Sequence, residues 1–208
     1  MIELNSDNLL ASGGGRDVYQ HPHDQDLLLK VNRNKPARPS LKAHFQIEKR
    51  RFGPYREWFV EHRHYIACLN QRGSGPSYLP EFRGFTDTSQ GIAQIVEKIR
   101  DADSGNLSKT LTQSLQSPDV NISELTALIE QLFRDFGRDR VVFRDLNPTN
   151  LCVVRNREGR PSHIVVVDGL GDFTLIKVRS YFVSAYRKWH RGALAEVLRY
   201  VEGFSDVD

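Results

Sequence analysis

Two side chains suited to phosphoryl-transfer chemistry, Asp145 and Asn150, lie five positions apart in the second half of the chain. They belong to the stretch Val-Val-Phe-Arg-Asp-Leu-Asn-Pro-Thr-Asn, which comes immediately before the apolar run 151–154. A carboxylate can orient an attacking hydroxyl group and accept its proton, and an amide oxygen can hold a magnesium ion against nucleotide phosphates. The alternative is a helix-to-strand turn in which these side chains make only local hydrogen bonds and Pro148 stiffens the loop.

The segment after this loop predicts a β-hairpin that ends on a second carboxylate. Two β-branched runs, 151–154 and 164–167, flank a polar turn that contains Gly and Pro. Asp168 follows the second run, and the glycines around it would let the backbone approach a metal ion closely. Alternatively, Asp168 begins an ordinary Asp-Gly turn. Asp172 and Phe173 lie beyond the strand and lack a following glycine, so we prefer Asp168 as the metal ligand.

Near the N-terminus, a glycine-rich turn precedes a strand that carries a lysine. Gly13, Gly14 and Gly15 could close their N–H groups over phosphate oxygens without a Cβ in the way, or form a flexible turn. Lys30 lies inside the apolar run 27–31, and an interior ammonium group needs an anionic partner. Bound phosphate and a helix glutamate would supply one, whereas on an edge strand the lysine would simply point to solvent.

The predicted helix 55–70 offers two glutamates as that partner. Glu61 precedes apolar residues at helical spacing, and Glu57 lies one turn earlier on roughly the same face. We favour Glu61 and keep Glu57 as the alternative. Either could instead pair with a neighbouring arginine at the surface.

The order of these features along the chain resembles the protein kinase-like superfamily. They are the glycine turn, the strand lysine, the helix glutamate, the Asp-x4-Asn loop and the strand-end aspartate. Within this superfamily, the chain resembles the small bacterial proteins of the PhoP-regulated YrbL family. The segments that carry this resemblance are 56–69, 79–85, 146–152 and 168–171. The resemblance covers nearly the whole chain and is best defined in the second half.

The resemblance implies an α+β, protein kinase-like fold of two lobes with ATP between them. The N-lobe, 1–99, would hold an antiparallel sheet and one helix, and 100–208 would form a reduced, mainly helical C-lobe. The implied roles follow the motifs: Gly13 to Gly15 over the phosphates, Lys30 on the phosphates, Glu61 steadying Lys30, Asp145 as the base, and Asn150 with Asp168 on Mg²⁺.

Three departures from the protein kinase pattern argue against a conventional protein kinase and for a compact small-molecule type kinase, or for a nucleotide-binding protein with weak or no turnover. For a kinase, we expect the acceptor to be a hydroxyl group of a small molecule, glycan or protein. Phe143 stands where a histidine is usual and Asn147 where a lysine is common, and the 40 residues after Asp168 leave no room for a full activation segment. Retention of Asp145 favours turnover. The alternatives are a nucleotide-binding regulator without useful turnover and a basic binding module.

Strand patterns predict that residues 8–31 form three strands and that 82–86 and 91–97 add two more to an antiparallel sheet. The pattern then changes to helix. We therefore expect a hinge at Glu97 to Ile99 whose backbone groups would meet the edge of an adenine ring. An ordinary exit from the strand is the alternative.

Helical periodicity dominates the rest of the chain. A stripe of apolar residues predicts a core helix from Ser123, capped by Asn121 and stopped by Gly137. A last helix is predicted over 181–201. We assign structural roles to both helices, the first as a support for the Asp145 loop.

Composition limits the function classes. The chain has 208 residues and 39% hydrophobic content, enough for a sizeable core. It lacks an apolar run of membrane-spanning length and a secretion-type N-terminus, so we expect a cytoplasmic protein. Cys68 and Cys152 are expected to be reduced, buried thiols. His62 and His64 would lie on different helix faces, which argues against a metal site there.

Charge is uneven although the net charge is only +3. Lysines and arginines concentrate in 32–56 and 177–199, where they could bind an anionic ligand or form solvated helix faces. Such clusters are more often solvated helix faces than binding sites, so we do not expect nucleic acid as the partner.

Overall fold

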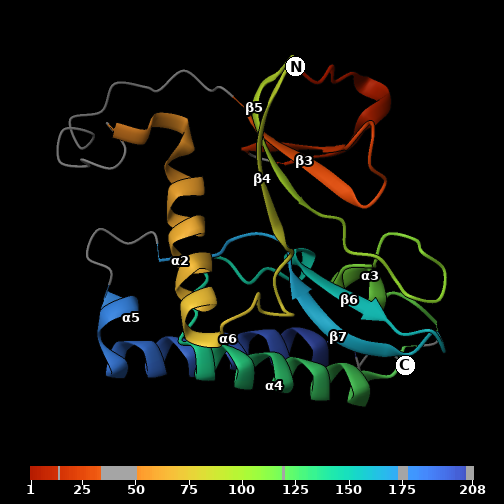
Figure 1. Ribbon diagram of the computed structural model, residues 1–208. Coiled ribbons are helices and arrows are strands. Elements are labelled where there is room, and N and C mark those ends of the chain that lie inside the picture. The colour runs from red at the N-terminus through yellow and green to blue at the C-terminus, as the bar shows by residue number, and fades with distance from the viewer. Residues whose placement is uncertain (14, 34–50, 119, 173–177, 205–208) are drawn as a thin grey trace. The chain divides into compact units, whose positions relative to one another are not determined.

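The computed structural model describes residues 1–13, 15–33, 51–118, 120–172 and 178–204 (Figure 1). The chain forms two compact units. The first comprises Met1–Phe59 and Pro80–Lys98, and the second comprises Val60–Leu79 and Ile99–Asp208. One boundary between the units therefore lies within the predicted hinge at Glu97 to Ile99.

The first unit is built on the predicted five-stranded antiparallel sheet (Figure 1). A short 3-10 helix, η1 (Ser6–Asn8), precedes it. The strand order is β1-β2-β3-β5-β4. The strands are β1 (Leu9–Ser12), β2 (Arg16–Gln20), β3 (Leu27–Asn32), β4 (Phe82–Thr88) and β5 (Gly91–Glu97). The α+β class and the strand predictions are thus confirmed.

Alternation along β3 places the lysine of the predicted site opposite the core. Leu29 and Val31 are buried with Leu4 and Ala93 in the core cluster of this unit. Side chains of successive strand residues point to opposite faces of a sheet. Lys30 therefore lies on the other face, and it is half-buried there.

A 3-10 turn, η3 (Gly53–Tyr55), leads into the helix α2 (Arg56–Arg72). The helices α3 (Leu111–Leu115) and α4 (Ile122–Asp139) belong to the second unit. Asn121 caps α4 as predicted, because its side chain accepts a hydrogen bond from the Glu124 N–H.

The predicted stop of α4 at Gly137 is wrong. The helix continues to Asp139, and Arg140 takes the left-handed C-cap conformation at a φ of 50°. Its N–H donates to the Phe136 carbonyl and so closes the last turn. Gly137 lies instead where a Cβ would be 3.6 Å from His190 Nε2, so it faces a side chain of the last helix.

The last predicted helix, 181–201, is confirmed as α6 (Val183–Glu202). A short helix, α5 (Val178–Tyr181), precedes it, and Phe182 between the two is extended. α6 lies beside α4 (Figure 1). The Tyr186 hydroxyl donates to the Phe136 carbonyl at 2.6 Å, and His190 Nε2 bonds the Phe133 carbonyl at 2.7 Å.

The predicted hairpin is confirmed as β6 (Leu151–Arg155) and β7 (Pro161–Val166), which pair antiparallel. A 3-10 turn, η4 (Pro148–Asn150), leads into it. The buried side chains of α4, the hairpin and the loop between them form one hydrophobic core.

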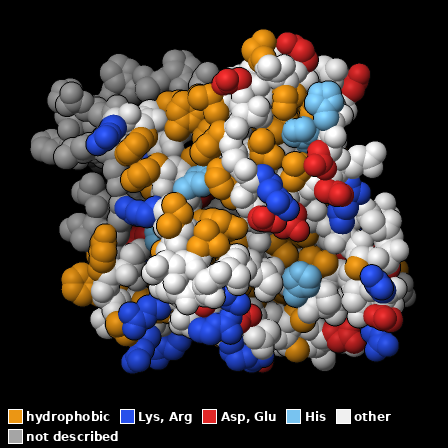
Figure 2. Space-filling view, in the orientation of Figure 1, with side chains coloured by type: hydrophobic (Ala, Val, Ile, Leu, Met, Phe, Trp, Pro, Cys, Tyr) orange, Lys and Arg blue, Asp and Glu red, His pale blue; other side chains and the backbone are white. Residues whose placement is uncertain are grey.

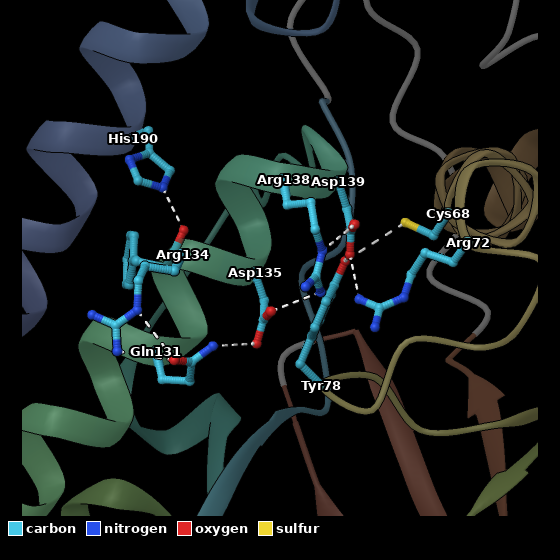
Figure 3. Close-up of polar contacts among 10 residues, drawn as sticks. Cys68, Arg72, Tyr78, Gln131, Arg134, Asp135, Arg138, Asp139 and His190 are labelled. Atoms are coloured by element: carbon cyan, nitrogen blue, oxygen red, sulfur yellow. Dashed lines mark hydrogen bonds and ion pairs between the residues drawn. The ribbon is translucent and has the colours of Figure 1, made fainter.

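A buried carboxylate joins three segments of this unit (Figure 3). Asp139 Oδ2 accepts hydrogen bonds from the Tyr78 hydroxyl and from Arg72 Nη1, both at 2.7 Å. Arg138 Nε donates to the other oxygen at 3.3 Å. Burial alone would raise the pKa of Asp139, but the hydrogen bonds from Tyr78, Arg72 and Arg138 together outweigh it and lower that pKa.

Cys68 and Cys152 are buried and form no disulfide, as expected. Burial raises the pKa of the Cys68 thiol, whose sulfur lies 4.0 Å from the Tyr78 hydroxyl. Within the described ranges, no helix combines the length and the apolar character needed to cross a bilayer.

We expect Asp139→Asn to lower the free energy of unfolding by about 1–3 kcal/mol at neutral pH, because an amide nitrogen cannot accept a hydrogen bond. The stabilisation by the carboxylate is fully present above its ordinary pKa of 3.8 and is lost as the pH falls through the lowered pKa of the folded state. Urea unfolding across this range measures both effects.

The matched control is Asp135→Asn, which removes a carboxylate from the same helix, where it pairs with the mostly exposed Arg138. Such a pair contributes about 0–1 kcal/mol, so this variant should keep the acid dependence of the wild type. If Asp139→Asn leaves the fall in the free energy of unfolding at acid pH unchanged, protonation of Asp139 is not its cause.

Candidate active site

The loop that carries Asp145 is ordered by its own side chains. Asp145 Oδ1 accepts a hydrogen bond from the Asn147 N–H at 3.1 Å. Asn147 Oδ1 in turn accepts from the Thr149 N–H and hydroxyl, both at 3.0 Å. The local hydrogen bonds expected of a simple helix-to-strand turn are therefore present. They order the loop and leave Asp145 exposed.

Backbone hydrogen bonds join this loop to the segment that carries Asp168. The Arg144 N–H donates to the Gly169 carbonyl and the Gly171 N–H donates to the Val142 carbonyl, both at 2.7 Å. Phe143 and Leu170 form the β-bridge between these bonds. Asp145 and Asp168 thus both adjoin one short antiparallel pairing.

Asn150 is held by the same frame. Its N–H donates to the Asn147 carbonyl at 2.7 Å, and its carbonyl accepts from the Val167 N–H at 2.9 Å. Asp168 follows directly, with Oδ1 accepting from the Gly169 N–H at 2.7 Å. The structure therefore brings together Asp145, Asn150 and Asp168 within the second unit.

Gly169 makes the close approach of the two segments sterically feasible. Its φ is 87°, and a Cβ at this position would lie 2.7 Å from the Asp145 carbonyl oxygen. An L side chain would therefore meet both backbone strain and a clash with main-chain atoms.

Phe143 occupies an apolar site. It is 1% exposed, and its ring centroid lies 4.7 Å from that of Phe136 on α4. The core helix therefore packs directly against the residue two positions before Asp145, as expected of a support for the loop.

The glycine turn and Lys30 belong to the first unit. Gly13 donates to the Arg16 carbonyl at 2.8 Å, and the Gly15 carbonyl accepts from the Arg33 N–H at 2.9 Å. Gly14 lies outside the described residues. Arg33 also donates to Asp17 at 2.6 Å, and this hydrogen bond is the main cause that lowers the pKa of Asp17.

The two glutamates proposed as partners of Lys30 have different surroundings. Glu57 belongs to the first unit, and its Oε2 lies 3.4 Å from Arg16 Nη2. Glu61 belongs to the second unit, so its pairing with Lys30 stays a prediction. Of the basic stretch 32–56, residues 34–50 lie outside the described part, as does residue 177 at the start of the second basic stretch.

The predicted hinge has part of its backbone engaged. The Glu97 N–H donates to the Glu81 carbonyl and the Lys98 N–H to the Asp26 carbonyl. The Ile99 carbonyl accepts from the Ser108 N–H, whereas the Ile99 N–H donates to none of the residues that the structure describes. The contact of this N–H with the edge of an adenine ring stays a prediction.

A contact that no sequence pattern indicates anchors the segment after Asp168. The Asp172 N–H donates to His64 Nε2 on α2 at 3.3 Å, and the Asp172 side chain is buried. Phe173 lies outside the described residues. Within those ranges, no three His, Cys, Asp or Glu side chains converge as a metal-binding group.

A pocket that no sequence pattern indicates lies beside Asp145. A cavity of about 680 Å³ lies between the Asp145 loop and α6. Its α6 wall includes Trp189, Glu196, Arg199 and Tyr200. Helix periodicity predicts one apolar face of α6 but does not show which loop that helix faces.

A protein-family model described as "PhoP regulatory network protein YrbL" matches residues 2–201. Among curated proteins, no match to the chain was found. Two similar solved structures are crystal structures of the Mycobacterium tuberculosis PknI kinase domain, one of a single mutant and one of a double mutant. Their sequence identities are 16% and 15%, both TM-scores are 0.46, and the matches cover 78% of this chain and 57% and 56% of the kinase chains.

We expect Gly169→Ala to lower the free energy of unfolding by about 1–3 kcal/mol more than Gly73→Ala does. Both glycines have left-handed backbones, at φ values of 87° and 73°, but a Cβ at Gly73 meets nothing within 4 Å. Denaturant unfolding of the two variants isolates the clash with Asp145. An equal loss of unfolding free energy in the two variants would show that the close approach of Gly169 to Asp145 does not constrain the residue at position 169.

Proposed function

The chain belongs to the family of the PhoP regulatory network protein YrbL, as its motifs predicted, and we propose that it is an ATP- and Mg²⁺-dependent phosphotransferase. The γ-phosphoryl group of ATP would pass to a hydroxyl group of an acceptor. The observation that carries this proposal is a set of backbone hydrogen bonds that joins 142–144 to 169–171 and Val167 to Asn150. Asp145, Asn150 and Asp168 lie together for this reason.

The donor set fits magnesium. Asn150 and Asp168 carry an amide oxygen and a carboxylate, which are the hard oxygen ligands that Mg²⁺ takes together with substrate phosphates and water. Bound there, the ion would neutralise charge on the phosphate oxygens. The hydrogen bond from the Val167 N–H to the Asn150 carbonyl fixes the backbone separation of the two candidate ligands, Asn150 and Asp168. Neither residue therefore depends on a long loop to reach the ion.

The first unit supports nucleotide binding with a separate set of groups. The turn at Gly13 and Gly15 precedes β2, and the half-buried Lys30 lies on the face of β3 opposite the core. A backbone turn and an ammonium group are both suited to phosphate oxygens. The Ile99 N–H offers a donor for the adenine edge.

Asp145 has the geometry of a base for the acceptor. It is exposed, it lines the pocket beside α6, and Oδ1 is oriented by the Asn147 N–H. Its other oxygen accepts no hydrogen bond from any described residue and can therefore bind an incoming hydroxyl group. Positioning of that hydroxyl group contributes most of the rate in such transfers.

We expect Asp145→Asn to bind ATP with Mg²⁺ as the wild type does but to lose about 10²–10⁴-fold in phosphoryl transfer, because the amide cannot accept the proton. Ligand binding to the folded state raises the melting temperature, and a hundredfold excess over Kd gives a shift of about 5–10 °C. Thermal shift measures nucleotide binding, and labelling of the acceptor from ATP with a radioactive γ-phosphate measures transfer.

The outcomes separate the functions. A wild-type protein that ATP with Mg²⁺ fails to stabilise is not a nucleotide-dependent enzyme. Stabilisation without transfer to any acceptor would indicate a nucleotide-binding regulator, and unchanged transfer in Asp145→Asn would remove Asp145 as the base.

We expect Asp168→Asn to lose most of the Mg²⁺ dependence of the ATP-induced thermal shift, because a neutral amide is a weaker magnesium ligand than a carboxylate. The comparison variant is Asp172→Asn, which changes the other carboxylate of the segment. This residue is buried at 1% exposure, so its substitution should alter stability without altering the Mg²⁺ response. The reverse pattern would transfer the metal-ligand role to Asp172.

A further inference from the structure

Two adjoining cavities form one groove along α6. The first, of about 680 Å³, begins at Asp145, and the second, of about 670 Å³, extends toward α5. They share four lining residues, namely Arg144, Trp189, Ala193 and Glu196. Each cavity has the volume of a site for a small molecule.

The groove near Asp145 presents aromatic side chains that are fixed by their neighbours. Trp189 and Tyr200 are half-buried against the core of the unit. The Tyr200 hydroxyl lies 3.2 Å from Thr112 Oγ1, and the Trp189 ring centroid lies 5.7 Å from that of Tyr186. A rigid aromatic side chain offers contact area at a low entropy cost and suits the C–H faces of a sugar ring.

Polar groups surround these aromatic side chains. Asp145, Asn147 and Glu196 bring carboxylate and amide groups to the same cavity. Such groups can bond several hydroxyl groups of one ligand, because they accept hydrogen bonds and the amide also donates them. The lining therefore fits a molecule with both apolar C–H faces and many hydroxyl groups.

The charge of the groove is predominantly positive. Arg144 and Arg199 line the first cavity, and Arg179 and Lys188 line the second. The carboxylates of the groove are Asp145 and Glu196. Figure 2 shows Lys and Arg side chains gathered along the lower edge of this view, over the region of α4, α5 and α6 in Figure 1.

The cations far from Asp145 are available to an anionic ligand. Within the part of the chain that the structure describes, Arg179 and Lys188 form no ion pair with a carboxylate. An anionic group on a ligand would meet both of them, and charge-assisted hydrogen bonds to such groups are strong.

Resting on the proposed function, we propose that this groove binds the phosphate acceptor and that the acceptor is a saccharide carrying a carboxylate or phosphate group. A hydroxyl group lies at Asp145 and the anionic group at Arg179 and Lys188. The hydroxyl oxygen bonds to the γ-phosphorus of ATP as the bond to the β,γ-bridging oxygen breaks. Asp145 takes the hydroxyl proton, and the products are a phosphomonoester and ADP.

Isothermal titration calorimetry of the full chain tests the acceptor class with glucose 1-phosphate, glucuronate and glucose. We expect the two anionic sugars to bind about tenfold or more tightly than glucose, a difference of ~1.4 kcal/mol, and added salt to reduce the difference. Equal affinity for all three sugars, or measurable binding of none, overturns the proposal.

A pair of charge reversals on one helix tests the location of the site. Lys188→Glu should remove most of the preference for the anionic sugars, because Lys188 lines the groove. Arg187→Glu is the matched control: it is also exposed and changes the same charge, but it lines a different cavity with Arg140 and His190. An equal loss in the two variants would indicate non-specific attraction and overturn the proposal.

Transfer assays separate this inference from the proposed function. With labelled ATP, Lys188→Glu should raise the KM for glucose 1-phosphate about tenfold or more and change kcat little, because the residue positions the acceptor. Saturable binding of anionic sugars without transfer would contradict the phosphotransferase function and support the groove as their site. Transfer to a serine peptide without sugar binding would support the phosphotransferase and overturn the acceptor class.

Discussion

The buried carboxylate of Asp139 fixes the approach to the candidate active site. It ends α4 two residues before Val141, and it receives hydrogen bonds from Tyr78 and Arg72. The Tyr78 carbonyl also accepts from the Val166 N–H at the end of β7. A single residue, Tyr78, therefore ties the start of the Asp145 loop to the strand that precedes Asp168, and a buried anion without these donors would be costly.

Much of the fold could be predicted because short-range sequence patterns indicate its strands and helices. Strand-type runs bounded by turn residues marked the strands of the first sheet and the hairpin, and the apolar stripe of α4 marked the core helix. The end of α4 could not be predicted, because Arg140 takes the left-handed conformation that Gly137 was expected to provide. The break at Phe182 has no composition signal, since no Gly or Pro lies at that position.

The candidate site also has a part that local sequence predicts and a part that depends on contacts between distant segments. The proximity of Asp145, Asn150 and Asp168 could be predicted because local turns and one hairpin bring them together. The hydrogen bonds of His64 with Asp172 and of Tyr78 with Asp139 span 108 and 61 positions, so no spacing rule shows them. The α6 wall of the groove depends on helix packing, which sequence periodicity describes only as one apolar face.

The hydrogen bond between the Val167 N–H and the Asn150 carbonyl has a consequence for how the hairpin can evolve. It lies at the end of the hairpin nearest the site, whereas the connecting turn, closed by the Asn156 N–H and the Arg160 carbonyl, lies at the far end. Insertions at exposed turns cost little, because loop-closure entropy grows slowly with length. An insertion at that tip would therefore add surface while leaving the spacing of the two magnesium-ligand candidates unchanged.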